Sequence, residues 1–182
     1  MSVDSMEFRQ ALGLFPTGVT VVAVAVGEGV RAMTVGSFTS LSLDPPLVLF
    51  CVGRKTRLAE VLTVGRPFSV NVLRGDQQAL STYFAGGWKD PAPPPHRFVP
   101  WGGGARLEGV AASIGGELSS LVDGGDHLIA IGTVTALVRG LPPIDPLIFF
   151  DRRYRTVDRS TGQSAPELDP AEATTQLFHE SW

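Results

Sequence analysis

The first twenty residues combine a helical pattern of apolar positions with a clear stop signal. Asp4 is a good helix N-cap, and Glu7 follows three residues later, as in a capping box. Apolar side chains then recur at helical spacing, at Phe8, Ala11, Leu12 and Phe15. Pro16 and Gly18 interrupt this pattern. The segment therefore predicts a helix that begins after Asp4 and ends before Pro16.

The chain then continues as short, Val-rich apolar runs separated by Gly, Pro and Asp. These runs predict strands over residues 19–26, 31–37, 47–52, 67–73, 113–122, 127–137 and 147–150. Tight turns at 27–29 and 123–125 predict two β-hairpins. We expect short helices at 56–62 and at 76–84, the second one capped by Asp76.

Residues 86–104 show neither the helical spacing of apolar residues nor the apolar runs of strands. Their density of Pro and Gly predicts a surface excursion without a regular element. The Arg-rich segment 152–155 is expected to be a small basic cluster around Tyr154. Many short strands with few helices favour a barrel or sandwich over regular βαβ alternation. The predicted fold class is therefore mainly β with helical caps.

Composition and charge favour one ordinary soluble domain. The 182 residues are 43% hydrophobic and 18% charged, so we expect a single domain over residues 1–182, with a core at about 5–157 and a tail at 158–182. The net charge of −3 excludes a broad basic face for nucleic acid. No apolar run approaches the roughly 20 residues that span a bilayer. The first residues lack an export pattern, so we expect a cytoplasmic protein.

Common catalytic and nucleotide-binding motifs are missing. The chain has no GxGxxG that opens a helix after a strand, and no GxxxxGKS/T, HExxH or GxSxG. His96, His127 and His179 lack metal-ligand spacing. Cys51 is the single cysteine, which forbids an internal disulfide. Its apolar surroundings favour a small core residue over a catalytic thiol.

Two polar stretches offer binding chemistry. Hydroxyl groups line one strand and its exit beside Gly36, at Thr34, Ser37, Thr39, Ser40 and Ser42. They fit either a half-exposed strand or a site for an anion or an amide ring. Segment 53–57 (GRKTR) follows the next strand and is expected to open a helix. Cationic side chains beside free helix amides would bind phosphate there.

His127 directly follows the second predicted turn, in the sequence GGDH. This position does not belong to an obvious core face. It fits either a structural histidine or a hydrogen-bonding, titratable group at the mouth of a pocket. The residues alone leave both interpretations open.

Five stretches, taken together and in this order, resemble the flavin reductase-like family. They are residues 8–20 (FRQALGLFPTGVT), 33–50 (MTVGSFTSLSLDPPLVLF), 68–73 (FSVNVL), 124–127 (GGDH) and 146–154 (PLIFFDRRY). The resemblance covers nearly the whole chain, and the run SFTSLSLDPP with a downstream GDH is specific. Members of this family are small FMN-binding split barrels that serve two-component flavin-dependent monooxygenases.

The resemblance implies a homodimeric split β-barrel with a flavin near the subunit interface. His127 is the implied catalytic residue, and no metal is implied. The implied cofactor-binding residues are Ala32, Met33, Thr34, Val35, Gly36, Ser37, Cys51, Val52, Gly53, Thr56, Arg57, Phe84 and Tyr154. Gly36 departs from the family, where Asn, Ser or Gln is common, and the loop 86–104 is unusually long. These departures leave FMN or FAD, and NADH or NADPH, as open alternatives.

The activity implied by the resemblance is NAD(P)H-dependent flavin reduction. A hydride passes from the reduced nicotinamide to N5 of the flavin, and the reduced flavin diffuses to a partner monooxygenase. The cofactors carry this chemistry, so no acid–base pair is required. Two alternatives stay open: a flavoenzyme that uses a retained flavin on its own small substrate, and a non-catalytic flavin- or haem-binding module. A purely structural domain would leave the hydroxyl-rich strand and the GGDH turn unexplained.

Overall fold

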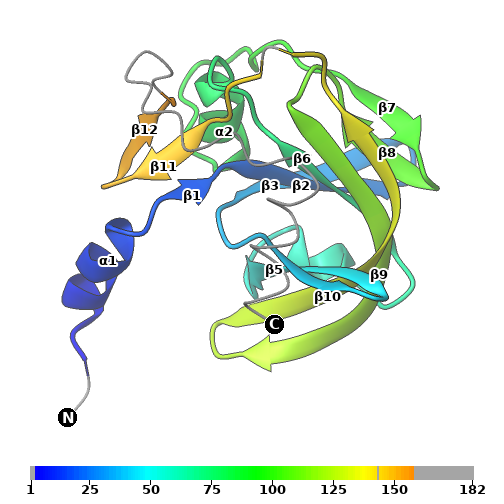
Figure 1. The fold of residues 1–182 in the computed structure, drawn as a ribbon, viewed down its shortest axis with the longest axis horizontal. Coiled ribbons are helices and arrows are strands. Elements are labelled where there is room, and N and C mark those ends of the chain that lie inside the picture. The colour runs from blue at the N-terminus through cyan, green and yellow to red at the C-terminus, as the bar shows by residue number, and fades with distance from the viewer. Residues whose placement is uncertain (1–2, 143, 158–182) are drawn as a thin grey trace, which may run out of the picture.

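The computed structural model describes residues 3–142 and 144–157, which form a mainly β protein (Figure 1). Its helices are α1 (Ser5–Gly13), α2 (Gln78–Phe84) and a 3-10 helix, η1 (Ala59–Val61). The strands are β1 (Thr17–Gly18), β2 (Thr20–Val26), β3 (Gly29–Val35), β4 (Thr39–Leu43), β5 (Pro46–Gly53), β6 (Pro67–Val72), β7 (Phe98–Trp101), β8 (Gly104–Leu107), β9 (Ala112–Gly124), β10 (His127–Arg139), β11 (Ile148–Phe150) and β12 (Arg153–Arg155). None of the described helices is long and apolar enough to cross a membrane. The predicted tail at 158–182, which includes His179, lies outside the described residues.

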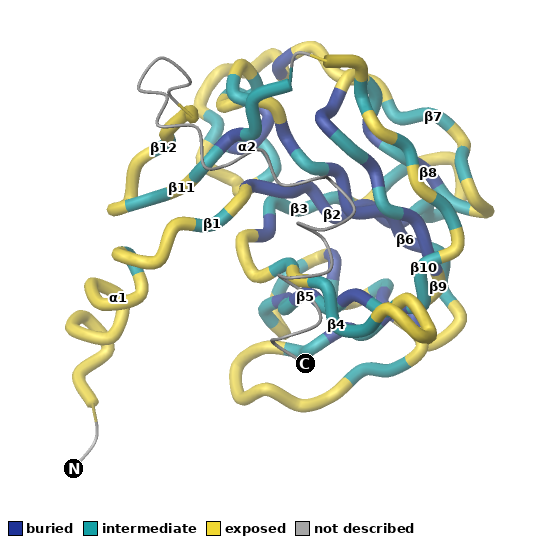
Figure 2. Tube along the Cα trace, viewed as in Figure 1, coloured by how far each residue is buried: buried dark blue, intermediate teal, exposed yellow. Residues whose placement is uncertain are grey.

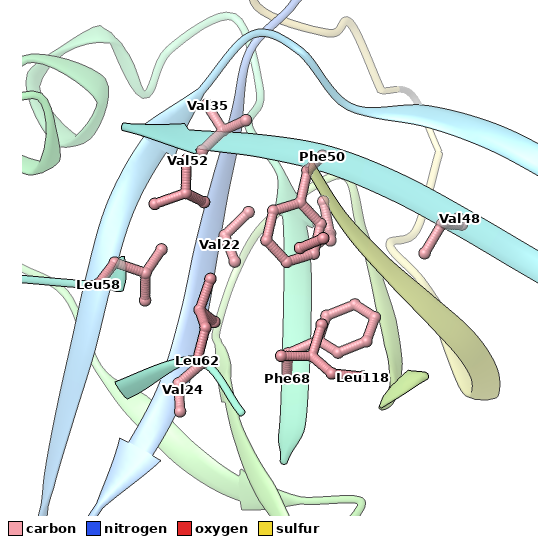
Figure 3. Close-up of a cluster of buried hydrophobic side chains, with 12 residues drawn as sticks. Val22, Val24, Val35, Val48, Phe50, Val52, Leu58, Leu62, Phe68 and Leu118 are labelled. Atoms are coloured by element: carbon pink, nitrogen blue, oxygen red, sulfur yellow. The ribbon is translucent and has the colours of Figure 1, made fainter. Parts of the chain in front are cut away.

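Seven strands form one antiparallel sheet in the order β3-β2-β6-β9-β10-β5-β4. The sheet curls around one of its own faces, so that β3 at one edge and β5 near the other line the same interior (Figure 3). Val35 of β3, Val52 of β5 and Phe68 of β6 all belong to this first apolar cluster. Burial of each such side chain contributes about 1.5–3 kcal/mol to the free energy of folding. The cluster therefore stabilises the curled sheet.

The ring of Phe68 on β6 leaves no room for a side chain at Gly132 on β10. It packs against Phe50 with ring centroids 5.4 Å apart. It also lies directly over Gly132 of β10, where an added Cβ would stand 2.3 Å from Phe68 Cε1. The missing side chain at 132 is therefore what lets this ring fill the interior.

A second apolar cluster joins the sheet to the smaller elements. It contains Val19, Val21, Leu73, Leu80, Leu107, Val110 and Leu147, contributed in part by β2, α2 and β8. Successive side chains of a strand point to opposite faces. On β2, Val22 therefore enters the first cluster while Val21 enters the second. Burial on both faces explains why β2 is Val-rich throughout.

Asn71 on β6 joins the two-stranded sheet β7–β8 to the main sheet. Its side chain is fully buried. The Nδ2 group donates to Val21 O at 2.9 Å and to Ser69 Oγ at 3.0 Å, while Oδ1 accepts from Leu107 N at 3.0 Å and from Ser113 Oγ at 2.9 Å. All four positions of the amide are therefore used.

The predicted helix and hairpins are confirmed. α1 begins after Asp4, whose Oδ1 accepts hydrogen bonds from Met6 N at 2.8 Å and Glu7 N at 3.1 Å. The two predicted hairpins are β2–β3 and β9–β10. The predicted strands at 47–52 and 67–73 correspond to β5 and β6.

α1 projects from the sheet and buries none of its residues within the single chain (Figures 1 and 2). Phe8 and Phe15, on its predicted apolar face, are 55% and 71% exposed. At its C-terminal end the helix is held by Asp151 N, which donates to Gly13 O at 2.8 Å. Large exposed apolar groups that gather on one element are typical of an interaction surface.

The prediction that residues 86–104 contain no regular element is wrong at the C-terminal end of that range. β7 pairs with β8, which begins at Gly104. Gly102 and Gly103 between them have positive φ values of 57° and 76°. Two such residues suit a two-residue hairpin turn. These glycines therefore connect two strands instead of preventing them.

Two smaller predictions also need correction. Asp76 does not cap α2, which has Gln77 at its N-cap without a side-chain cap; Asp76 instead pairs with Arg74, whose Nε lies 3.2 Å from Asp76 Oδ1. The helix predicted at 56–62 is only the 3-10 turn η1. The Arg-rich segment 152–155, predicted as a basic cluster around Tyr154, includes β12, which pairs with β11.

Candidate functional site

A cavity of about 350 Å³ opens where the end of β3 meets β1, α2 and the hairpin β11–β12. It is lined by Thr17, Val19, Thr34, Gly36, Ser81, Ala85, Phe149 and Tyr154. Thr34, Gly36 and Tyr154 are among the residues predicted for the site. The volume falls within the range of about 300–1,000 Å³ that is usual for small-molecule sites.

Hydrogen bonds hold the polar side chains of this cavity in place. Thr34 Oγ1 donates to Ser81 O at 2.7 Å, and Ser81 Oγ lies 2.9 Å from Tyr154 Oη. The ring of Phe149 packs edge-on against Tyr154, with centroids 5.4 Å apart. Strand β3, helix α2 and strand β12 are thereby joined at one apolar wall with a few fixed polar atoms.

Ser37 connects this cavity to β5. Its Oγ accepts a hydrogen bond from Cys51 N at 2.9 Å and donates to Cys51 O at 3.3 Å. Cys51 is half-buried and alternates with Phe50 and Val52, which point into the first apolar cluster. The interpretation of Cys51 as a core residue is therefore wrong, because its side chain lies on the other face of β5.

Four other predicted site residues face the apolar clusters. Val35 and Val52 are buried in the first cluster, Met33 packs against it, and Ala32 packs against the second cluster. Val35 and Val52 are 4% and 0% exposed, so neither their side chains nor their backbone is open to a ligand in this chain. Their predicted binding role stays a prediction.

Segment 53–57 does not open a helix, so the phosphate site predicted from helix amides is wrong in that form. The segment is a turn in which Thr56 Oγ1 donates to Gly53 O at 2.8 Å and accepts from Ala59 N at 3.3 Å. Lys55 and Arg57 are exposed, and within residues 3–142 and 144–157 neither forms an ion pair. Their charges remain available for an anion.

His127 begins β10 directly opposite Gly53 of β5. Its Nδ1 lies 2.7 Å from Asp126 Oδ1, and its Nε2 lies 3.7 Å from the point where a Cβ on Gly53 would stand. The same point is 3.5 Å from Thr56 Cγ2. Two effects of His127 hold the pKa of Asp126 below its ordinary value. The larger is the hydrogen bond to the ring, and the smaller is the charge of the ring. The histidine therefore faces the turn at 53–56.

Most of the predicted site residues come together in two neighbouring groups. The first group surrounds the cavity of Thr34, Gly36 and Tyr154. The second consists of Cys51, Gly53, Thr56 and His127, around the end of β5. The consecutive residues 36 and 37 join them, since Gly36 lines the cavity and Ser37 bonds to Cys51.

Phe84 lies apart from both groups. Its ring contacts Tyr83, His96 and Phe98 at centroid distances of 5.0, 5.2 and 5.9 Å, and it packs against the second apolar cluster. It does not line the 350 Å³ cavity. A role for Phe84 in binding therefore stays a prediction.

Ser81, Phe149 and Thr17 line the cavity without having been predicted for it. Thr17 and Phe149 lie inside the stretches that carry the family resemblance, so a signal for them was present. Ser81 is an ordinary serine in the middle of α2, and only the packing of α2 against β3 brings it between Thr34 and Tyr154.

The site is built for binding and orientation more than for acid–base chemistry. Among the residues that the structure describes, no three His, Cys, Asp or Glu side chains gather as metal ligands. The cavity offers an apolar wall, and its rim offers hydroxyls, backbone groups, two cations and one imidazole. This donor set fits a flat, largely apolar ring that carries an anionic tail.

Comparison with known proteins identifies the family of this chain. The flavin reductase-like domain matches residues 12–158. The chain is 39% identical to the reductase component of 4-hydroxyphenylacetate 3-monooxygenase from Thermus thermophilus, over 81% of this chain and 93% of that protein. It is also 39% identical to the NADH-dependent FMN reductase AsuE2 of Streptomyces nodosus subsp. asukaensis, over 83% and 84% of the two chains. The structure of Streptomyces globisporus NADH:FAD oxidoreductase SgcE6 with NAD and FAD fragments matches with a TM-score of 0.77 and 35% identity, over 87% and 96%.

The fold and the site thus define a flavin-binding oxidoreductase class. The chain belongs to the flavin reductase-like family, as its sequence predicted.

Proposed function

We propose that this chain is the NADH-dependent flavin reductase component of a two-component monooxygenase. The observation that carries the proposal is the apolar cavity beside Thr34, Gly36 and Tyr154, which adjoins the Ser37–Cys51 hydrogen bond, in a chain of this family. Relatives named as NADH-dependent FMN and FAD reductases, and as a monooxygenase reductase component, support both the nucleotide and the role.

The flavin ring is proposed to occupy the cavity beside Thr34, Gly36 and Tyr154. Gly36 has no side chain, which lets a ring edge approach the backbone closely. The anionic tail would extend past Ser37 toward Thr56 and Arg57. The exposed guanidinium of Arg57 would supply charge to a phosphate there.

Bound flavin supplies a hydride acceptor for the reduced nicotinamide, and the protein supplies binding and alignment. The apolar wall formed by Val19, Phe149 and Tyr154 excludes water from one side of the ring. His127 presents Nε2 beside the turn at 53–56. We propose that this nitrogen donates to, or accepts from, the nicotinamide nucleotide.

The finer architecture is part of the proposal. We propose a single domain over the chain, a split β-barrel and a homodimer. The exposed side chains of Phe8 on α1 and of Phe15 just after it support the dimer, because a second chain would bury them. Light scattering should give twice the mass of one chain. A Phe8→Ser/Phe15→Ser variant should shift toward the monomer, whereas a monomeric wild-type protein would refute the dimer.

The activity is tested by oxidation of NADH and NADPH with added FMN, FAD or riboflavin. We expect flavin-dependent NADH oxidation and release of the reduced flavin. Failure to oxidise either nucleotide with any flavin would overturn the proposal and favour a non-catalytic binding module. A purified protein that is yellow and keeps its flavin on reduction would instead indicate a flavoenzyme with its own substrate.

A further inference from the structure

Arg54 contacts one short segment of the chain three times. Its backbone N donates to Asp126 O at 3.0 Å, and its Nε donates to Gly125 O at 2.8 Å. Its Nη2 forms an ion pair with the carboxylate of Asp123. From the sequence, Arg54 belongs to a segment expected to bind phosphate. Its guanidinium is instead committed to the turn between β9 and β10.

That turn precedes His127, and few other contacts hold it in place. Residues 122–127 are all exposed at the tip of the β9–β10 hairpin (Figure 2). The tip contains Gly124 and Gly125, the second with a φ of +72°. Glycines at an exposed tip give the backbone many accessible conformations. Besides the end of the strand pairing, the Arg54 contacts are what join this tip to β5.

We propose that Arg54 is a positioning residue that holds His127 beside Gly53 and Thr56. Arg54 follows Gly53 directly, so the residue that fixes the turn adjoins the residue that the imidazole faces. A guanidinium can bond a carbonyl and a carboxylate at the same time, whereas an ammonium group acts as a single point charge. The inference rests on the proposed function, because it assigns Arg54 to the same site.

A purely structural surface ion pair is the alternative. Exposed ion pairs contribute little to stability. Arg54 and Asp123 have side chains that are 40% and 86% exposed. The other arginine ion pairs among the described residues, Arg74–Asp76 and Arg97–Glu108, do not hold a residue of the predicted site. A structural role would change the melting temperature without changing nucleotide binding.

The test compares Arg54→Ala, Arg54→Lys and Asp123→Asn with the wild-type protein. For Arg54→Ala we expect KM for NADH to rise roughly fivefold, with kcat for saturating nucleotide and flavin nearly unchanged. Arg54→Lys and Asp123→Asn should show smaller increases, because each keeps part of the side-chain contacts. Arg139→Ala is the matched control. Arg139 lies at the far end of β10, is exposed and forms no ion pair with the residues described.

Two readouts separate this inference from the proposed function. In the ligand-free protein, the side-chain NMR signals of His127 should shift or broaden in Arg54→Ala and stay unchanged in Arg139→Ala. In the double variant Arg54→Ala/His127→Ala, KM for NADH should equal that of His127→Ala alone. Unchanged His127 signals together with additive KM effects would overturn the positioning role. A protein without reductase activity but with shifted His127 signals would refute only the proposed function.

Discussion

The polar groups around Asn71 and those around His127 differ in how much of their hydrogen-bonding capacity the chain itself uses. Around Asn71, two backbone groups and two hydroxyls complete the amide, and no buried side-chain N or O among the described residues lacks a partner. Around His127, the Nδ1 is bonded to Asp126, while Nε2 forms no hydrogen bond with the described residues.

Burial explains this difference. An unsatisfied polar group in the interior costs about 1–3 kcal/mol, so the cluster around Asn71 has to be complete. An exposed group can be hydrated, so the rim can leave donors and acceptors for a ligand at little cost to folding. Changes in the first region should therefore affect stability, and changes in the second should affect binding.

The largest expected effect is from Asn71→Leu. The apolar replacement would leave Leu107 N and Ser113 Oγ without their Asn71 partner in the interior. We expect a loss of about 3 kcal/mol in the free energy of unfolding, measured by urea denaturation. Ser37→Ala, which removes an exposed hydroxyl, is the matched rim variant and should lose less than about 1 kcal/mol. Equal losses for the two variants would remove the distinction between the regions.

A second contrast uses one glycine from the buried interior and one from the rim. At Gly132 an added Cβ would stand 2.3 Å from Phe68 Cε1, so Gly132→Ala must displace a core ring. We expect it to lower the free energy of unfolding by roughly 2 kcal/mol. A Cβ added at Gly53 would stand 3.5 Å from Thr56 Cγ2 and 3.7 Å from His127 Nε2, which are ordinary van der Waals distances.

Gly53→Ala should therefore keep the melting temperature while placing a methyl group beside His127 Nε2. Its flavin or NADH affinity should fall about threefold, measured by fluorescence titration. A destabilised Gly53→Ala variant with unchanged affinities would contradict the assignment of position 53 to the rim.

An effect on activity alone is expected for His127→Ala. NADH oxidation should fall roughly tenfold, since one hydrogen bond to the nucleotide is lost. The free energy of unfolding should stay within about 0.5 kcal/mol of the wild-type value, because the side chain is exposed. Steady-state kinetics together with urea denaturation check both parts. Unchanged turnover would show that His127 has no role in the reaction.

The two regions also differ in how far the sequence predicts them. Alternating and continuous Val runs predict β2, β5 and β6, because burial on one or both faces is written directly into local hydrophobicity. The completeness of the Asn71 cluster is not visible locally, since its partners lie up to 50 residues away. Asn71 in the sequence resembles a solvent-facing strand position.

At the rim, the sequence predicts candidate site residues, whose binding roles stay predictions, and misses the contacts that some of them make. From the sequence, Arg54 is predicted to be a free cation, because its partner Asp123 is 69 residues away. Ser81 carries no local signal at all. The prediction of a helix after β5 fails because the Thr56 hydroxyl bonds to Gly53 O and forms a turn. A long-range contact therefore decides the first correction, and a local side-chain hydrogen bond decides the second.

The smallest expected effect concerns Asp126 at the rim. Hydrogen bonding to His127 holds the pKa of this carboxyl below its ordinary value of 3.8. A carboxyl whose pKa is lowered by folding stabilises the folded state above its ordinary pKa, and this contribution is lost as the pH falls through the folded-state pKa. Wild type should therefore melt slightly above Asp126→Asn at about pH 6, and the difference should vanish toward about pH 3.

Melting curves of both proteins across this pH range measure the difference directly. The side chain of Asp126 is 94% exposed, so the gain should be small beside that of the Asn71 cluster. A difference that grows as the pH falls would have the wrong sign for a lowered pKa. It would mean that the Asp126–His127 contact does not persist in solution. The rim would then hold His127 through the backbone and Arg54 alone.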